Sequence, residues 1–212
     1  NSTGGAVLVR TSDPSSEERG LAEISYGEYD TQRYEAYATG GSERVAFDAA
    51  GVVRRSDGFI DNVYSGTNDD ASYDNWAVRF GAKVELTDKA SILLRYAHSD
   101  TDDAAPVVAN AFEDNGRVYA TAIFYPGAIV ATKPDEASHD YVPEFNSETD
   151  VVQITTTVEF ESATLTSYTQ YREEGGTHHE DFDVSSLPVF HFNFDTTDEI
   201  FTQEFLLAST QQ

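Results

Sequence analysis

The chain has 212 residues, of which 38 are acidic and 13 basic, so its formal net charge is −25. Such a chain repels phosphate backbones, which argues against nucleic acid as a partner. The charge is typical of well-solvated loops, and the other interpretation is a surface that gathers cations. There is no cysteine, which excludes a disulfide framework and a cysteine metal site.

The sequence contains no methionine, and residues 1–5 (NSTGG) do not have the pattern of a signal peptide. We therefore expect a processed protein or a fragment of a longer one. No apolar run approaches ~18 residues, so we expect no membrane-spanning helix. This leaves open a membrane barrel, because barrels cross bilayers with short alternating strands.

Strand-forming residues are abundant, with 12 Tyr and 13 Phe. Alternation is clearest in residues 76–86, where Val78 and Phe80 share one face and Arg79 and Lys83 share the other. The pattern predicts an all-β fold with about eight strands of roughly 9–11 residues, the length that a tilted strand needs to cross a bilayer. In chain order, a short apolar strand is expected at residues 6–10, and the eight longer ones are expected at 21–29, 33–39, 44–54, 76–86, 91–98, 152–160, 164–172 and 199–208.

The expected connections alternate between short and long. Residues 40–43, 87–89 and 161–162 are tight turns, and the long loops cover about 56–75, 99–150 and 173–198. One departure is the short connection at 27–31, on the side of the long loops. This sorting predicts an antiparallel up-and-down meander, part of a large transmembrane β-barrel. Alternation alone does not decide which face is inward, because a soluble β-domain hides its apolar face and a membrane barrel exposes it.

Five segments resemble the TonB-dependent receptors, a family of outer-membrane transporters. Residues 1–11 are similar to the end of the family's plug domain, with Gly-Gly, an alternating apolar strand and Thr. The other segments resemble barrel strands, with a departure at Leu206, where many members carry a basic residue. These segments are Gly27-Glu28-Tyr29-Asp30 with Arg33, residues 54–62, residues 74–79 and residues 201–209.

The resemblance implies a domain organisation and a function. Residues 1–15 would be the C-terminal end of the plug, and residues 16–212 the N-terminal part of a barrel of about 22 strands. The function implied is energy-coupled uptake across the bacterial cell outer membrane. Expected partners are outer-membrane lipid, a small nutrient ligand (a siderophore–iron complex, cobalamin or a glycan) and a TonB-type energy-coupling protein. The energy-coupling protein would contact a part of the receptor that precedes this chain.

The outer loops supply the candidate ligand-binding residues. Residues 99–150 mix aromatic side chains with prolines, and a loop this long is usually functional or disordered. Tyr119, Phe124 and Tyr125 are the candidates there, suited to a sugar or an aryl siderophore. The loop at 173–198 adds His178 and His179.

Metal binding and catalysis have weaker sequence signals. Residues 178–183 (HHEDFD) gather metal-ligand types, but adjacent histidines on an extended segment point to opposite sides. Residues 68–70 and 100–103 resemble pieces of calcium loops without the full spacing of one, and a polar loop tip is the favoured interpretation. Because no catalytic motif is present, we expect no enzyme, no catalytic residue, no metal site and no cofactor.

The rival to the transporter hypothesis is a secreted or surface-exposed β-sandwich binding module, such as an adhesin or a glycan-binding domain. Its apolar face would point inward, against a second sheet. An enzyme on a β-sandwich is a third class without a motif to support it.

Overall fold

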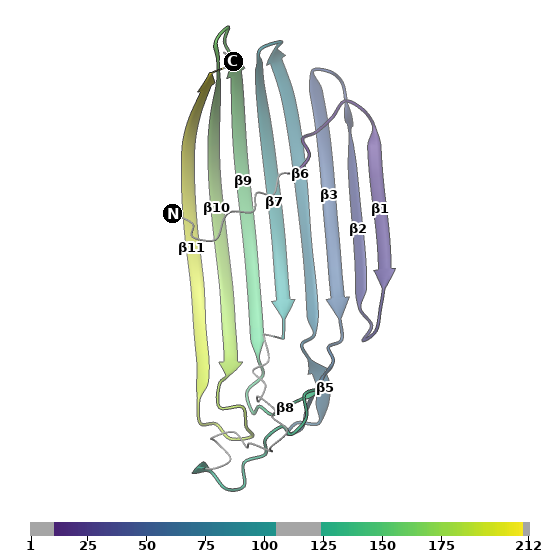
Figure 1. The fold of residues 1–212 in the computed structure, drawn as a ribbon, viewed down its shortest axis with the longest axis vertical. Helices are drawn as coiled ribbons and strands as arrows, with labels where there is room; N and C mark the ends of the chain where they lie inside the picture. The colour runs from purple at the N-terminus through teal and green to yellow at the C-terminus, as the bar shows by residue number, and fades with distance from the viewer. Residues whose placement is uncertain (1–10, 105–123, 210–212) are drawn as a thin grey trace.

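A computed structural model describes residues 11–104 and 124–209, apart from the side chains of residues 68 and 69. Its main feature is one antiparallel sheet of eight strands, which lie side by side in Figure 1 in the order β1-β2-β3-β6-β7-β9-β10-β11. The strands are β1 (Arg19–Tyr26), β2 (Gln32–Gly41), β3 (Val45–Ser56), β6 (Tyr73–Thr87), β7 (Ala90–Asp103), β9 (Glu144–Glu159), β10 (Ala163–Asp181) and β11 (His191–Ser209).

The predicted all-β class and the eight-stranded antiparallel meander are confirmed. Within the described residues the sheet is open, because β1 and β11 each have a single neighbour and do not pair with one another. The sequence predicted that these strands form only part of a larger barrel, so closure of that barrel stays a prediction. The expected strand at 6–10 lies outside them.

Strand register gives the sheet two chemically different faces, since residues paired across neighbouring strands point to the same side. One row across six strands contains Ala49, Phe80, Tyr96, Val152, Tyr171 and Phe201. Another row contains Thr39, Asp48, Gly81, Arg95, Gln153 and Gln170. We call the side of the first row the apolar face and the side of the second row the polar face.

The expected extent of two long loops was wrong. β7 continues to Asp103 and β9 begins at Glu144, so the connection between them is shorter than 99–150. The loop expected at 173–198 is mostly strand, because β10 runs to Asp181 and pairs with β11 from His191 onward. Gly175 and Gly176 both lie inside this ladder. Pairing on both sides of β10 outweighs the low strand propensity of glycine there.

The long connections assemble at one end of the sheet, at the bottom of Figure 1. A second sheet joins β4 (Ile60–Asn62), β5 (Thr67–Asp70) and β8 (Glu136–Ala137), with β4 antiparallel to β5 and parallel to β8. Ile129 and Ser186 are linked by two hydrogen bonds, Ile129 N to Ser186 Oγ at 2.9 Å and Ser186 N to Ile129 O at 3.0 Å. We call residues 57–72, 124–143 and 182–190 together the loop cap.

Burial is concentrated in the loop cap. The largest side chains that are almost fully buried are Val184, Ser138 and Ser185, all from this region. Side chains of the apolar face are largely exposed, and Phe80 in the middle of the sheet is 52% exposed. Among the described residues, no helix has the length and apolar character needed to span a membrane.

Candidate functional site

Aromatic rings surround His178 on the polar face, at the end of the sheet that carries the loop cap. The His178 ring lies 5.7 Å from Phe145 on β9 and 5.7 Å from Phe194 on β11, measured between centroids. Phe192 lies 6.2 Å from it and also contacts Phe182. We call His178, Phe145, Phe192 and Phe194 the aromatic patch. Its three phenylalanines are exposed, so the patch offers flat apolar surfaces around one polar ring.

His179 points away from this patch, as expected for adjacent residues of a strand. Its ring lies 5.6 Å from Tyr141, and its Nδ1 lies 3.2 Å from a carboxylate oxygen of Glu144. The two histidines therefore do not share a ligand. Their expected location in a loop was wrong, because both lie within β10 and pair with Phe194 and Asn193.

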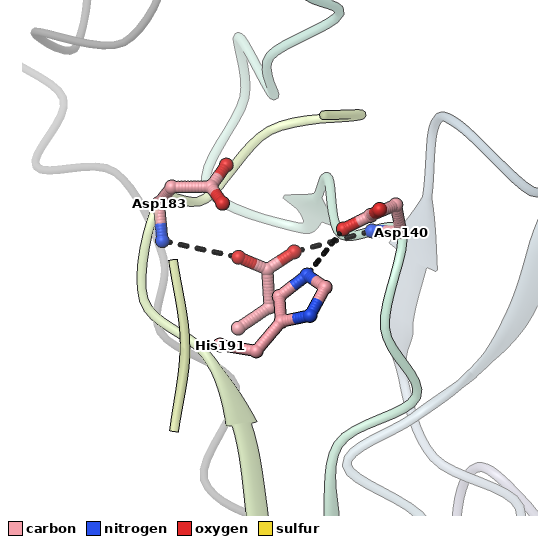
Figure 2. Close-up of side chains that lie close together, drawn as sticks. Asp140, Asp183 and His191 are labelled. Carbon is pink, nitrogen blue, oxygen red and sulfur yellow. Dashed lines mark hydrogen bonds and ion pairs between the residues drawn. The ribbon is translucent and has the colours of Figure 1, made fainter. Parts of the chain in front are cut away.

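A second group of polar side chains lies where β10 and β11 meet the loop cap, and Figure 2 shows it in close-up. Asp140, Asp181, Asp183 and His191 each offer one ligand atom, and these atoms lie within 4.8 Å of one another. His191 Nε2 lies 2.9 Å from Asp140 Oδ1. We call these four residues the carboxylate cluster.

Backbone amides already engage the buried carboxylates of this cluster. Asp181 accepts from the amides of Asp140 at 3.1 Å and Asp183 at 3.0 Å. Asp183 accepts from the amides of Val189 at 3.1 Å and Phe190 at 2.8 Å. These bonds close the 182–190 turn, so the cluster has a structural role in the cap.

Burial is the main factor that raises the pKa of Asp181, to about 6, and the negative charge of Asp183 raises it further. Oxygen and imidazole donors at these distances are of the type that binds divalent cations. The cluster is therefore one of two groups of described residues whose ligand atoms lie close enough together for such an ion, and the other is His98, Glu148 and Asp150.

Sequence reasoning found part of this cluster. Asp181 and Asp183 belong to the HHEDFD segment, but Asp140 and His191 were not included. Asp140 is distant in the chain from the HHEDFD segment. His191 becomes part of the cluster because the pairing of β10 with β11 extends to Asp181 and His191. The signal that was available is strand propensity in residues 191–199, which alternate Phe and Thr with polar residues.

The other expected ligand residues are not brought to the aromatic patch. Phe124 and Tyr125 are exposed in the loop cap, and among ring contacts of described residues none joins them to His178 or His179. Tyr119 lies outside the described residues.

The two segments compared with calcium loops have other roles. Residues 100–103 are part of β7, where successive side chains alternate between the faces and cannot converge on one ion. Asp70 is buried and lies 2.6 Å from His139 Nε2, and Asn62 Nδ2 donates to the carbonyl oxygen of His139 at 3.1 Å. These contacts tie the 57–72 connection to the 124–143 connection.

Comparisons with known proteins identify no relative. No family model, no curated protein and no solved structure matches the chain.

Proposed function

We propose that this chain forms part of the wall of an outer-membrane transporter, with its apolar face toward lipid and its polar face toward the lumen. Together with the resemblance to the TonB-dependent receptors, this implies energy-coupled uptake of a small nutrient such as a siderophore–iron complex, cobalamin or a glycan. The observation that carries the proposal is a band of apolar side chains, exposed or half-buried, on one face of all eight strands.

The band is bounded by aromatic rings on the side of the loop cap. Going along each strand from that side, the first Tyr, Trp or Phe side chains on the apolar face are Tyr26, Tyr34, Trp76, Tyr96, Tyr171 and Phe201, on β1, β2, β6, β7, β10 and β11. Beyond them the same face becomes acidic, with Asp100, Asp150 and Glu173. Tyrosine and tryptophan concentrate at membrane–water interfaces because their rings have an apolar body and a polar atom.

The height of the band suits a bilayer. From Trp76 to Val84 on β6, a rise of ~3.4 Å per residue gives roughly 27 Å along the strand. A tilt of about 40° reduces this to about 21 Å along the membrane normal. Side chains at both ends extend it toward the ~25 Å band typical of outer-membrane barrels.

The boundary of the band also shifts along the strand direction as one moves across the sheet, as strand tilt requires. Trp76 pairs with Asp100, whereas Tyr96 pairs with Phe80, so the boundary moves toward the short turns between β6 and β7. The row through Tyr26 reaches β11 at Asp195, six residues before Phe201. At ~3.4 Å per residue, this is a shift of roughly 20 Å over the sheet. A barrel whose strands tilt by about 40° and lie ~4.8 Å apart needs a shift of roughly 28 Å over the same strands.

The aromatic patch is the best candidate for ligand contact. It lies on the polar face, which the proposal places toward the lumen, and at the end where the long connections gather. Exposed aromatic rings around a histidine suit a ligand with flat apolar surfaces and a hydrogen-bonding group. His178 and its neighbours therefore replace the loop residues Phe124 and Tyr125 as the first residues to test.

The test uses single cysteines, since the chain has none of its own, in the intact protein reconstituted in lipid vesicles. Polarity-sensitive labels at Val78, Phe80 and Ile154 should report lipid, and labels at the neighbouring Arg79 and Gln153 should report water. If the first set were instead shielded in a lipid-free protein, the transporter proposal would fail. The β-sandwich binding module would then be the better hypothesis, with a second sheet covering the apolar face.

Ligand contact has its own test, by equilibrium binding of candidate nutrients to the intact protein. Phe194→Ala should weaken binding of the nutrient that is taken up by about tenfold, because it removes one ring of the patch. Phe201→Ala is the matched control, since it removes a phenylalanine from the opposite face of the same strand, and it should leave the affinity unchanged. Equal effects of the two substitutions would remove the patch from the binding site.

A further inference from the structure

The chain that enters β1 first crosses four other strands on the polar face (Figure 1). Residues 12–15 bond to Arg95 on β7 and to Thr39 on β2, and Pro14 lies beside Gly81 on β6. Together with Asp48 on β3, Arg95, Thr39 and Gly81 form one row in the sheet register. We call residues 12–15 the strap. A single row of contacts running perpendicular to the strands means that the strap lies across the sheet rather than along a strand.

Arg95 holds the first half of the strap. Its Nη2 donates to the carbonyl oxygen of Ser12 at 2.9 Å and to the carboxylate of Asp13 at 2.7 Å. The Arg95 side chain is only 14% exposed. A guanidinium that bonds two acceptors from a partly shielded position restrains the chain more firmly than an exposed ion pair does.

Thr39 holds the second half of the strap. The amide of Ser15 donates to Thr39 Oγ1 at 2.8 Å, and that hydroxyl lies 3.2 Å from the carbonyl oxygen of Ser15 and 3.0 Å from that of Phe47. Because one hydroxyl donates a single proton, it bonds either of these carbonyls at a time. Thr39 is buried beneath the strap, whereas its neighbour Ala38 is exposed on the apolar face.

Gly81 provides the space in which the strap lies. A Cβ atom at this position would lie 2.4 Å from Asp48 Oδ1 and 3.1 Å from Cγ of Pro14. Pro14 is buried, and the Asp48 side chain is fully buried 3.5 Å from Arg79. The missing side chain therefore allows both Asp48 and Pro14 to pack at this point.

β1 is the element that needs such a restraint. It is the shortest strand of the main sheet, all of its residues are exposed, and among the described residues it pairs with β2 alone. A short strand with little burial opens locally at a low cost in free energy. The strap ends at Ser15, a few residues before β1 begins at Arg19.

We propose that the strap is a clamp on β1: Arg95 and Thr39 hold residues 12–15, and the restraint keeps β1 paired with β2. Arg95 and Thr39 are then positioning residues that act on β1 through the strap. The clamp does not depend on lipid contact at the apolar face, so it extends beyond the proposed transport function.

The first measurement is hydrogen exchange at the β1 amides that bond to β2, in the intact protein. Arg95→Met and Thr39→Val should each lower the protection of these amides by about tenfold, because the freed strap no longer limits fraying of β1. Thr39→Ser keeps the hydroxyl and should retain the protection. Arg172→Met is the matched control, since Arg172 lies on the polar face of β10 away from the strap, and it should leave β1 unchanged.

A disulfide tests the same clamp in the opposite direction. Ser15→Cys with Thr39→Cys should form a disulfide under mild oxidation, whereas Ser15→Cys with Ala38→Cys should not, because Ala38 is on the other face. Oxidation of the first pair in an Arg95→Met background should restore the protection of β1. If β1 stays protected in both single variants, or stays unprotected after the disulfide forms, the clamp is overturned. Neither result changes the label experiment, so failures of the two proposals are distinguishable.

Discussion

The loop cap and the eight-stranded sheet differ in which of their side chains are buried and which are exposed. The cap has buried side chains at its centre, among them Val184 and Ser185. Its buried polar groups are paired by hydrogen bonds, such as that between His139 and Asp70. The sheet has few buried side chains and exposes Phe80, Phe201 and Phe205 on one face. The cap is organised as a protein in water is, and the sheet is organised with apolar residues outward.

Under the proposed transport function, this difference fits one chain to two surroundings, water at the cap and lipid at the sheet. In water, exposed phenylalanines on a whole sheet face would drive association, whereas hydrocarbon accepts them. The buried hydrogen bond between His139 and Asp70 joins two connections of the cap, which hydrophobic packing alone would hold less firmly. Substitutions of the same chemistry should therefore have different costs in the two regions.

The largest difference is expected between two histidine–aspartate pairs. His139→Ala in the cap leaves the buried carboxylate of Asp70 without its partner and should cost about 3–5 kcal/mol of local stability. His98→Ala in the sheet removes a histidine whose partner, Asp150, is 44% exposed, and should cost about 0–1 kcal/mol. Hydrogen exchange of amides in the 57–72 and 144–159 segments measures both, and equal costs would contradict the comparison.

The next largest effect concerns the two faces of β6. Ala82→Arg places a charge in the middle of the apolar face and should destabilise the protein in lipid vesicles by about 2–4 kcal/mol. Ala77→Arg makes the same change on the polar face of the same strand, and we expect less than about 1 kcal/mol. Denaturant titrations in vesicles measure the difference. A larger cost for Ala77→Arg would reverse the assignment of the faces.

A smaller effect is expected at Gly81, the glycine beneath the strap. Gly81→Ala forces a Cβ against Asp48 and should cost about 1–3 kcal/mol through overpacking. Gly51→Ala on β3 is the control, because its nearest contact would be an ordinary 3.7 Å from the carbonyl oxygen of Ala77. The same denaturant titration applies. If Gly81→Ala and Gly51→Ala lower the stability equally, the strap is not closely packed against Gly81.

The smallest and most local effect is a pH dependence in the cap. Because the pKa of Asp181 is raised to about 6, its carboxyl binds a proton more tightly when the cap is folded than when it is unfolded. Its charged form therefore opposes folding above pH 6, and this contribution fades as the pH falls through 6. Amides of Asp140 and Asp183 should exchange more slowly, relative to their intrinsic rates, at pH 5 than at pH 7.5. Asp181→Asn should flatten this dependence, and a dependence that persists in Asp181→Asn has another source.

The sequence predicted the sheet well because alternation and turn positions are local signals. The tight turns at 40–43 and 87–89 lie where β2 meets β3 and β6 meets β7. The outer halves of β10 and β11 were missed because Gly175, Gly176 and the acidic residues beside them are poor strand formers. Long ladders with both neighbours stabilise them, and such pairing is not visible in a window of sequence.

The candidate site was predicted only in part for a related reason. His178 and His179 were selected by residue type, but the partners of His178 come from β9 and β11, and Asp140 reaches the carboxylate cluster from a distant connection. The strap was missed as well, since nothing near Asp13 or Pro14 indicates a contact with Arg95. Contacts that depend on which strands become neighbours require the topology first.

The stepped boundary of the apolar band has a consequence for how this sheet tolerates insertions and deletions. Adding one residue within β7 would turn every side chain beyond it to the wrong face, so that Tyr96 or Leu94 would exchange places with Arg95. Adding two residues would keep each side chain on its face and only move the aromatic boundary along the strand by one further step. Length changes in pairs are therefore the form of variation that this architecture accepts, and single-residue changes are confined to its turns and its loop cap.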